Sequence, residues 1–506
     1  MAVSRKTTIA QLAAAVPEAA ILGDAAVCVS GISYDSRQVA PESLFAALRG
    51  ADLDGHAFVH DAAANGAAAL LVEEPTSVSL PQIVVSDTRA ALARISARFF
   101  AHPSEQIGVV GITGTDGKTT TSYLVDHILR TAGLRTGLIG TVAIRIDGRE
   151  TLHSTRQTTP ESSDVQGYLR AMANAGTDWA TIEATSHGLA MHRLDEVTFR
   201  IGAITNITHE HLDFHGSVDA YRRAKAILLE RIAEVGGAVV INADDEGARS
   251  VLSYASGAKI ICFSPSGQAA DAQLTARSLE ATADGSCFLL DAGSAGSAEV
   301  RLPLIGQFNV DNALCAAAVA LAVGLDLGAI AAALSSAPSV PGRMANIVCG
   351  QPFSVVVDYA HTPDSLEKVI RLLKRLHPAG RTIVVFGSAG DRDTEKRALQ
   401  GSVVAANADI GVVTSEDPRC EDPETIIDQI CEGALASGAI LGRTLFRDAD
   451  RRVAIEIGLA LAQPGDCVLL AGKGHESSII WGREQIPWDE AGTARELIAK
   501  LGCCRN

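Results

Sequence analysis

The sequence predicts an α/β protein with several domains and largely parallel sheets. Apolar, β-branched runs alternate with Ala- and Leu-rich stretches along the whole chain, which is the pattern of strands connected by helices. The length of 506 residues exceeds what a single hydrophobic core usually fills. We find no internal repeat, so the predicted domains are not copies of one another.

Two interruptions divide the chain into three predicted domains. His102-Pro103-Ser104 ends a predicted helix that runs through Ala90 to Phe100, just before the next apolar strand. Ser339-Val340-Pro341-Gly342 separates an Ala-rich helix from a second group of strands. We therefore expect domains at residues 1–103, 104–340 and 341–506.

The composition favours a cytoplasmic protein. The net charge of −16 argues against a nucleic-acid or anionic-membrane partner, because such partners require a basic face. The ten cysteines form no CxxC pair, which indicates reduced thiols rather than disulfides or a zinc site. The longest apolar run, Ala313 to Leu325, is too short to span a bilayer and predicts a buried helix. We expect a monomer without a membrane span.

A glycine-rich loop at residues 111–120 predicts phosphate binding. It follows the apolar strand Ile107 to Val110 and precedes the amphipathic segment Tyr123 to Leu129. In such a loop backbone N–H groups turn toward phosphate oxygens, Lys118 reaches the β- and γ-phosphates, and the Thr119 hydroxyl can ligate Mg²⁺. Ile112 stands where a standard Walker A motif has glycine, so the loop is a variant. The expected nucleotide contacts are Gly114, Thr115, Asp116, Gly117, Lys118, Thr119 and Thr120.

Four apolar runs in the last third predict a second parallel sheet. The runs are Ser354 to Val357, Thr382 to Phe386, Ile410 to Val413 and Cys467 to Leu470. A polar loop follows each run, and ligands bind at the carboxyl ends of strands in doubly wound sheets. We therefore expect the four loops to meet at one cleft, although an ordinary polar turn is the alternative for each loop taken singly.

Glu183 is a candidate Mg²⁺ ligand because it ends the predicted strand that starts at Trp179. Magnesium sites use few carboxylates together with phosphate oxygens. A second run, Ile201 to Ile207, comes shortly before a histidine-rich segment. Those histidines could suggest zinc, but no HExxH spacing or cysteine partner supports it, and hydrogen bonding is their commoner role.

Five motifs occur in combination along the chain: the loop Gly114 to Thr120, Glu183 with Ser186-His187-Gly188, His211-Leu212-Asp213, Gly306-Gln307-Phe308-Asn309 with Asn312, and Asp358-Tyr359-Ala360-His361. Together they resemble the motifs of the Mur ligases, and among these the MurE type. The resemblance extends from Asp35-Ser36-Arg37 to His475-Glu476. It implies a small α/β UDP-sugar-binding domain, a central P-loop ATPase-like domain with a parallel sheet, and a C-terminal Rossmann-like domain that binds an amino acid.

The resemblance implies an ATP-dependent enzyme that forms an amide bond in peptidoglycan synthesis. ATP would phosphorylate the D-glutamyl carboxylate of UDP-N-acetylmuramoyl-L-Ala-D-Glu, and the amine of a diamino acid would then displace phosphate. Two anions must meet in the first step, so cations must stand between them. Lys118 and Mg²⁺ would supply those charges.

The family pattern also assigns the metal and nucleotide contacts. The implied Mg²⁺ contacts are Thr119, Glu183, His211 and Lys225, where Lys225 matches the family's carbamylated lysine. Taken alone, Lys225 would pass for a solvated helical charge. The implied ATP contacts beyond the phosphate loop are Asn309, Asn312, Arg343, Asp358 and His361. Helix capping is the alternative role of Asn309.

For the sugar nucleotide, the resemblance implies contacts in the first two domains. The matching residues are Ser36, Arg37, His56, Thr158, Thr159, Thr185 and Arg193. Arginine can bind carboxylate or phosphate through two parallel hydrogen bonds. Thr185 replaces the family's usual serine and keeps the hydroxyl, whereas Met191 replaces a familiar glutamine and loses its hydrogen bonds.

The identity of the diamino acid depends on the later loops. The implied pocket residues are Arg392, Glu416, Asp417, Pro418, Arg419, Gly472 and Glu476. Arg392 and Arg419 could bind the second carboxylate of meso-diaminopimelate, with Glu476 on the distal ammonium. Asp417 stands where the diaminopimelate enzymes typically have asparagine, and its charge would favour an amine. L-Lysine, L-ornithine and relaxed specificity therefore stay open.

Two other functions compete with this hypothesis. Another amide ligase of the superfamily, such as a dipeptide-adding or folylpolyglutamate enzyme, would share the phosphate loop but not Asp35-Ser36-Arg37 or Glu416-Asp417-Pro418-Arg419. An ATP-dependent interaction switch would hydrolyse ATP without forming a bond. A ligase should need both the UDP-muramoyl dipeptide and a diamino acid for sustained phosphate release.

Overall fold

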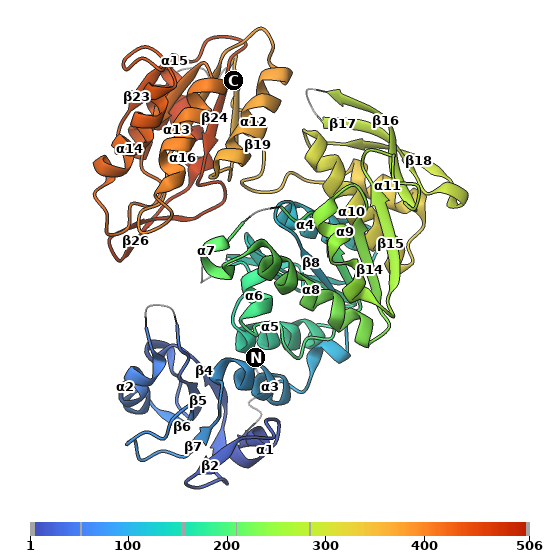
Figure 1. Cartoon of the computed structure of the whole chain (residues 1–506), viewed down its shortest axis with the longest axis vertical. Coiled ribbons are helices and arrows are strands. Elements are labelled where there is room, and N and C mark those ends of the chain that lie inside the picture. The colour runs from blue at the N-terminus through green and yellow to red at the C-terminus, as the bar shows by residue number, and fades with distance from the viewer. Residues whose placement is uncertain (1–5, 51–52, 153–156, 209, 283–284, 502–506) are drawn as a thin grey trace. The chain divides into compact units, whose positions relative to one another are not determined.

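The computed structural model describes residues 6–50, 53–152, 157–208, 210–282 and 285–501 (Figure 1). The chain forms two compact units, of which one contains residues 1–279, 288–301 and 308–337. The other contains residues 280–287, 302–307 and 338–506. Three main sheets have five, eleven and six strands, as an α/β protein with three domains requires. The exact domain boundaries expected after residues 103 and 340 stay predictions.

The N-terminal sheet has the order β2-β7-β6-β5-β4, and only β2 is antiparallel to its neighbour. Successive side chains of β5 point to opposite faces of the sheet. Leu44 and Ala46 pack with residues of α1 and α3, whereas Phe45 and Ala47 pack with residues of α2. The elements are β1 (Thr7–Thr8), α1 (Ile9–Ala13), β2 (Ala20–Leu22), β3 (Cys28–Val29), β4 (Gly31–Ser33), β5 (Ser43–Ala46), α2 (Val59–Ala64), β6 (Ala67–Val72), β7 (Gln82–Val84) and α3 (Thr88–Phe99).

The middle sheet places β8 between β12 and β13, and all three strands are parallel. The sheet order is β11-β10-β9-β12-β8-β13-β14-β15-β16-β17-β18. The chain passes from β8 to β9 and β12 on one side and then crosses to β13 on the other side. Because the direction of strand order reverses at β8, a ligand crevice is expected at its carboxyl end. The strands are β8 (Gly108–Thr113), β9 (Thr136–Ile139), β10 (Ala143–Ile146), β11 (Arg149–Leu152), β12 (Trp179–Glu183), β13 (Ile201–Ile204), β14 (Ala238–Asn242), β15 (Lys259–Ser264), β16 (Leu274–Thr282), β17 (Gly285–Asp291) and β18 (Ser297–Leu302).

Helices surround this sheet (Figure 1). They are α4 (Lys118–Thr131), α5 (Ser162–Asn174), α6 (Ser186–Ala190), α7 (Leu212–His215), α8 (Val218–Glu234), α9 (Glu246–Ser250), α10 (Gln307–Val323) and α11 (Leu327–Ser335). The buried helix expected at Ala313 to Leu325 lies within and just after α10, which begins six residues earlier at Gln307. The strand expected at Ile201 to Ile207 ends at Ile204, because the next residues bind the phosphate loop instead.

The C-terminal sheet has the order β19-β20-β24-β21-β22-β23, and the four predicted strands are parallel within it. Alternate residues of β21 separate two cores: Val384 and Phe386 face α12 to α14, and Ile383 and Val385 face α15 and α16. The elements are β19 (Ala345–Asn346), β20 (Ser354–Asp358), α12 (Pro363–Leu376), β21 (Thr382–Phe386), α13 (Glu395–Asn407), β22 (Ile410–Val413), α14 (Pro423–Ala436), β23 (Leu445–Arg447), α15 (Arg451–Leu461), β24 (Cys467–Ala471), β25 (Ser478–Trp481), β26 (Glu484–Pro487) and α16 (Glu490–Lys500).

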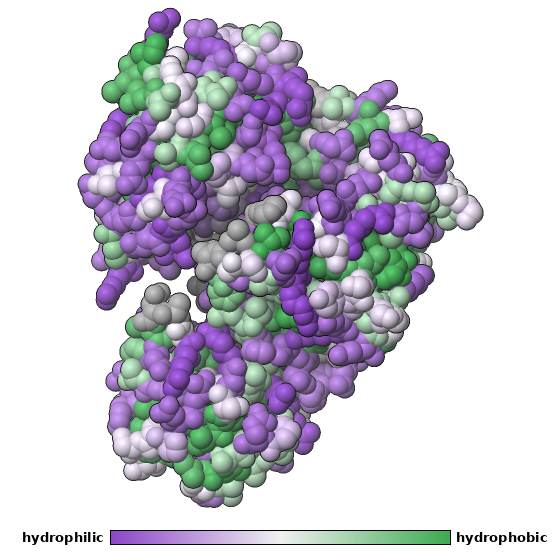
Figure 2. All heavy atoms as spheres, viewed as in Figure 1, coloured by the Kyte–Doolittle hydropathy of each residue, from purple (hydrophilic) through white to green (hydrophobic). Residues whose placement is uncertain are grey.

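Among the described residues, no helix combines the length and the apolar character needed to cross a membrane. Figure 2 shows that hydrophilic residues cover most of the face in view, with hydrophobic residues in separate patches.

Candidate active site

The phosphate loop connects β8 to α4, and two of its glycines have backbone conformations that favour glycine. Gly117 has φ = 84° and precedes the first residue of α4, and Gly114 has φ = 154°. A Cβ atom on Gly117 would lie 2.1 Å from Asn312 Oδ1, and one on Gly114 would lie 1.9 Å from Thr205 Oγ1. Both positions therefore require glycine for steric as well as conformational reasons.

The segment after β13 supports the loop from one side. Thr205 Oγ1 donates a hydrogen bond to the Asp116 carbonyl (2.6 Å), and the Asp116 N–H donates to Asn206 Oδ1 (3.0 Å). Sequence reasoning missed Thr205 and Asn206. Their signal was available, because polar residues directly after a parallel strand lie at the ligand-binding edge of the sheet.

Lys118 folds back over its own loop. Its Nζ donates to the carbonyls of Gly114 (3.0 Å) and Thr115 (2.7 Å), so the ammonium lies beside the backbone that would bind phosphates. Asn312 lies beside Gly117, and its Oδ1 accepts a hydrogen bond from Thr121 (3.4 Å). Asn312 also donates to Asn309 Oδ1 (3.3 Å), and both asparagines are buried.

Glu183, at the end of β12, is the centre of a cluster of hydroxyl groups beside the loop. Its Oε2 accepts hydrogen bonds from Thr119 Oγ1 and Thr141 Oγ1, each at 2.9 Å. Its Oε1 accepts from the Thr141 N–H (2.9 Å). Glu183 is completely buried, and a buried carboxylate is stable only where such donors surround it. Sequence reasoning missed Thr141, which follows β9.

The donor set around Glu183 fits Mg²⁺. Carboxylate and hydroxyl oxygens are hard ligands, and Mg²⁺ commonly combines one or two protein carboxylates with substrate phosphates. Among the described His, Cys, Asp and Glu residues, no group of three could hold a metal by itself. A metal beside Glu183 would therefore rely on hydroxyl, water and phosphate oxygens.

A chain of threonine hydroxyls extends from Glu183 to predicted substrate contacts. Thr141 Oγ1 lies 3.0 Å from Thr158 Oγ1, and Thr159 Oγ1 donates to the Glu183 carbonyl (2.7 Å). Thr159 Oγ1 also lies 2.9 Å from Thr185 Oγ1. Arg193 Nη1 donates to the Thr159 carbonyl (3.1 Å). The structure thus brings four of the predicted sugar-nucleotide residues together with the predicted metal ligands Thr119 and Glu183.

Lys225 is buried on α8 and does not form the solvated surface charge that its sequence context alone suggested. Its Nζ donates to the Gly114 carbonyl (2.6 Å) and lies 4.5 Å from the centre of the Tyr221 ring. Burial lowers the pKa of Lys225 well below its usual range, and the nearby charge of Lys118 lowers it further. Both effects increase the share of the neutral amine, which is the nucleophilic form, relative to an exposed lysine.

The His211 ring lies near the rings of His187 and Tyr221. The His211 ring packs edge-on against His187, with 4.6 Å between ring centres, and lies 6.4 Å from the Tyr221 ring. Tyr221 in turn contacts the phosphate loop, because its hydroxyl lies 3.0 Å from Thr115 Oγ1. Sequence reasoning gave Tyr221 no role.

Glu161 connects Arg193 to the N-terminal domain. Its carboxylate accepts two hydrogen bonds from Arg89 Nη1 (2.9 and 3.0 Å) and lies 3.0 Å from Arg193 Nη2. Tyr34 makes a second connection, with its hydroxyl 2.7 Å from Asp164 Oδ2. Neither Arg89 nor Glu161 was predicted, because their partners are distant in the sequence.

The predicted residues of the N-terminal domain are engaged locally. Arg37 forms two hydrogen bonds with Asp35 (2.9 and 2.8 Å), although its side chain is 86% exposed. Ser36, between them, accepts a hydrogen bond from Asn65 through its carbonyl (2.9 Å). To bind a ligand, the Arg37 guanidinium must therefore either break its hydrogen bonds to Asp35 or bind the ligand while it keeps them.

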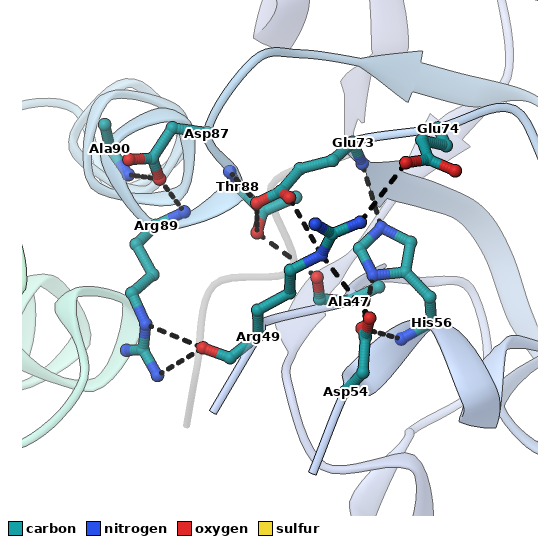
Figure 3. Close-up of polar contacts among 10 residues, drawn as sticks. All are labelled: Ala47, Arg49, Asp54, His56, Glu73, Glu74, Asp87, Thr88, Arg89 and Ala90. Atoms are coloured by element: carbon teal, nitrogen blue, oxygen red, sulfur yellow. Dashed lines mark hydrogen bonds and ion pairs between the residues drawn. The ribbon is translucent and has the colours of Figure 1, made fainter. Parts of the chain in front are cut away.

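Figure 3 shows His56 between Asp54 and Glu73. The Glu73 N–H donates to His56 Nε2 (2.9 Å), so the ring proton is on Nδ1, which lies 2.6 Å from Asp54 Oδ1. Both ring nitrogens are thus engaged within the domain. Arg49 lies beside them and contacts Glu73 (3.0 Å), and its carbonyl accepts from Arg89 (3.4 Å), which links this cluster to Glu161.

In the C-terminal unit, the loop after β20 is anchored by Asp358. Its carboxylate accepts hydrogen bonds from the N–H groups of Met344 (2.7 Å) and Ala360 (2.8 Å). Burial raises the pKa of Asp358, while the charge of Arg343 and these two hydrogen bonds oppose the rise. The Arg343 guanidinium lies over the Tyr359 ring, 4.6 Å from its centre.

The four polar loops lie together at the carboxyl edge of the sheet, as expected. The Gly472 N–H donates to the Asp358 carbonyl (3.1 Å), the Gly390 N–H donates to the Asp417 carbonyl (2.8 Å), and Gln400 donates to the His361 carbonyl (2.6 Å). The predicted pocket residue Arg392 lies in the loop after β21 and is exposed, and Pro418 lies in the loop after β22. Burial raises the pKa of Glu416, whose side chain lies against Gly472.

These features define a class of protein: a multidomain α/β enzyme with a phosphate loop, a carboxylate at a neighbouring strand end and a second doubly wound sheet. The chain belongs to the Mur ligase family, whose members are ATP-dependent enzymes that form amide bonds. Residues 28–100 match the Mur ligase family catalytic domain, residues 112–320 the Mur ligase middle domain, and residues 342–474 the Mur ligase glutamate ligase domain.

Relatives of known name match nearly the whole chain. The UDP-N-acetylmuramyl-tripeptide synthetase of Roseiflexus sp. (strain RS-1) is 46% identical over 94% of this chain and 95% of its own length. The UDP-N-acetylmuramoyl-L-alanyl-D-glutamate--2,6-diaminopimelate ligase of Streptomyces coelicolor is 40% identical over 98% and 97%. A solved structure of an enzyme with this second name is 30% identical, covers 98% of this chain and 100% of its own, and has a TM-score of 0.65. The chain is thus of the MurE type within its family.

Proposed function

We propose that this ligase adds a diamino acid, with meso-diaminopimelate as the preferred one, to the D-glutamate of UDP-N-acetylmuramoyl-L-Ala-D-Glu. The observation that carries the proposal is the hydrogen-bonded network around Glu183. It joins the phosphate loop, through Thr119, to Thr159 and Arg193, which are predicted contacts of the UDP-muramoyl peptide. The names of the relatives from Roseiflexus and Streptomyces coelicolor support the same substrate class.

The proposed reaction has two steps. The γ-phosphoryl group of ATP is transferred to a carboxylate oxygen of D-glutamate, which gives an acyl phosphate and ADP. The amine of the diamino acid then attacks the acyl carbon, phosphate leaves, and the nitrogen loses a proton. The peptide bond is thus formed at the expense of one ATP.

Lys118 has the main electrostatic role in the first step. Two unit negative charges 4 Å apart repel each other by about 4 kcal/mol at an effective dielectric constant of about 20. The ammonium of Lys118 already lies against the loop backbone, where it donates hydrogen bonds to the carbonyls of Gly114 and Thr115. Neutral carbonyls release an ammonium to an arriving phosphate more readily than a carboxylate would.

Mg²⁺ would be held by Thr119 and Glu183, with His211 and a carbamate on Lys225 as further ligands, and would neutralise the phosphate charge. The burial of Lys225 and its lowered pKa support this assignment, because both increase the share of the neutral amine, and an amine adds to CO₂ only in its neutral form, with release of one proton. The nucleotide contacts proposed for Asn309, Asn312, Arg343, Asp358 and His361 follow the family pattern, as do a cytoplasmic location and a monomeric state.

The preference for diaminopimelate is supported by Arg419. This residue has φ = 53°, and its backbone is held by hydrogen bonds with Ile480 (3.0 Å) and Gly482 (2.7 Å). Arg419 Nε is buried and has no hydrogen-bond partner among the described residues. An arginine with a fixed backbone and a buried Nε without a partner suits an incoming carboxylate, which diaminopimelate carries at its distal end and lysine lacks.

Parallel assays of the full chain with ATP and Mg²⁺ test the proposal. Each reaction contains UDP-N-acetylmuramoyl-L-Ala-D-Glu with meso-diaminopimelate, L-lysine or L-ornithine, and product mass and phosphate release are measured. We expect the highest kcat/KM with meso-diaminopimelate and little phosphate release when either substrate is left out. A Lys118→Met variant reports the background of contaminating ATPases.

Three outcomes would overturn parts of the proposal. A higher kcat/KM with L-lysine or L-ornithine would reject the preferred amino acid. Product formation only with a dipeptide or with a folate substrate would indicate another amide ligase of the superfamily. Sustained phosphate release without either substrate, at a rate that Lys118→Met abolishes, would favour an ATP-dependent switch.

A further inference from the structure

A fully buried lysine bridges two carboxylates of the predicted diamino-acid site. Lys473, two residues after β24, donates from Nζ to Asp417 Oδ1 (2.8 Å) and to Glu476 Oε2 (2.5 Å). The Lys473 side chain is inaccessible to solvent, and that of Asp417 is nearly so. A buried ammonium is stable only beside such anions, so the three side chains form one unit.

Asp417 and Arg419 both form hydrogen bonds with one residue of strand β25, Ile480. Asp417 Oδ1 also accepts a hydrogen bond from the Ile480 N–H (2.9 Å), while the Ile480 carbonyl accepts from the Arg419 N–H (3.0 Å). Asp417 and Arg419 are therefore fixed relative to each other. A change in the charge of one acts at a defined position beside the other.

The pairing with Lys473 changes what Asp417 does to a ligand. An unpaired carboxylate beside Arg419 would repel the distal carboxylate of diaminopimelate, as its sequence position suggested. An ion pair with an N–O distance of 2.8 Å acts at longer range as a dipole, whose field falls more steeply with distance than that of a charge. The charges of Arg419, Asp417, Lys473 and Glu476 cancel, and one net negative charge remains if Lys473 is neutral.

We propose that Lys473 is a positioning residue that determines specificity, because it neutralises Asp417 and so permits a distal end that carries both a carboxylate and an ammonium. This inference rests on the proposed function. Arg419 then binds the distal carboxylate, and Glu476, oriented by Lys473, binds the distal ammonium. Loss of the Lys473 charge converts the pocket into one that favours a lone ammonium, as in L-lysine.

Three variants of the full chain test this role: Lys473→Met, Asp417→Asn and the double variant. For each, kcat and KM are measured with meso-diaminopimelate and with L-lysine. We expect Lys473→Met to lower the ratio of kcat/KM for diaminopimelate to that for lysine by about tenfold or more, mainly through the KM of diaminopimelate. Asp417→Asn should raise the ratio, and the double variant should restore it to within about threefold of the wild-type value.

A structural role alone would give a different result. In that case Lys473→Met would reduce the activity with both amino acids equally, and the ratio would stay at the wild-type value. If Lys473→Met does not fold, the double variant decides, because it removes the buried charge of Asp417 together with that of Lys473: a ratio equal to that of Asp417→Asn would overturn the inference. Lys374→Met, on the exposed surface of α12, should leave the ratio unchanged.

The two proposals fail in distinguishable ways. If the wild-type chain joins no diamino acid to the UDP-muramoyl dipeptide, the proposed function is wrong. If the wild-type chain makes the product but its amino-acid preference does not respond to Lys473→Met, only the role of Lys473 is wrong.

Discussion

The phosphate loop and the loops of the C-terminal sheet are held in place by different kinds of interaction. Around the phosphate loop, glycine conformations and hydroxyl groups surround one carboxylate, Glu183. Around the C-terminal loops, buried ion pairs such as Arg451–Glu490 and Lys473–Asp417 connect the segments. The first region can therefore accept a polyanion without breaking an ion pair between side chains, whereas the geometry of the second depends directly on charge.

The largest effect on stability is expected from the buried pair in the C-terminal unit. Arg451 donates to Glu490 and also to the carbonyls of Ser415 (3.1 Å) and Ala471 (2.7 Å), which precede two of the pocket loops. Arg451→Met leaves Glu490 buried without its cation, so we expect a loss of about 3–5 kcal/mol in the free energy of unfolding. Denaturant unfolding followed by circular dichroism measures it.

The neighbouring residue provides a matched control. Arg452 pairs with Glu496 at 2.8 Å on the surface, where the two side chains are 37% and 64% exposed. Arg452→Met should cost less than about 1 kcal/mol. Similar losses for the two variants would contradict the view that buried charge pairs hold the C-terminal loops.

A smaller effect is expected from a methyl group in the phosphate loop. Gly117→Ala should cost about 1–2 kcal/mol for the left-handed backbone and more for the contact with Asn312, and it should weaken ATP binding about tenfold. Gly133→Ala has a similar φ of 87° but nothing within 4 Å of the new Cβ, so it isolates the backbone cost. Calorimetric titration with ATP and thermal unfolding measure both quantities.

A double variant separates the two causes. Gly117→Ala with Asn312→Ala removes the atom that lies 2.1 Å from the new Cβ. Its unfolding free energy should exceed the value expected if the two single losses simply added. Strict additivity would show that the contact with Asn312 does not constrain the loop.

The smallest effect concerns pH. Burial raises the pKa of Glu416 in the folded state, so the folded protein binds more protons than the unfolded chain, and stability falls as pH rises from the unfolded pKa through the folded one. Glu416→Gln removes this loss. We expect the variant to gain on the order of 1 kcal/mol relative to wild type at neutral pH and nothing below about pH 4.

Thermal unfolding scanned from pH 4 to pH 8 measures this difference. Glu484→Gln, on the exposed strand β26, should give a flat difference across the same range. A gap for Glu416→Gln that closes as pH rises would reverse the sign and reject the buried-carboxylate explanation.

The sequence predicted the fold well because its signals are local. The alternation of apolar runs and helical stretches located four of the five parallel strands of the C-terminal sheet and missed the short strand β23. The segment 111–120 spans the end of β8, the phosphate loop and the start of α4. The end of β13 was predicted three residues too late. Its apolar pattern continues to Ile207, but hydrogen bonds to Asp116 remove Thr205 and Asn206 from the strand.

The candidate site was predictable where a motif carries the chemistry and not where packing does. Thr119 and Glu183 were recognised from position and residue type, and the structure places them in contact. Arg451, Glu161 and Lys473 could not be found in this way, because a buried charge looks in the sequence like a surface charge. Their partners lie 39, 72 and 56 positions away.

The hydroxyl groups around Glu183 have a consequence for the polarity of the site. A carboxylate can only accept hydrogen bonds, so the protons of Thr119 and Thr141 point toward Glu183. The lone pairs of both oxygens are thereby directed away from the carboxylate. The buried Glu183 carboxylate thus fixes the orientation of two hydroxyl groups that could otherwise rotate. Each hydroxyl then presents its acceptor lone pairs in a fixed direction.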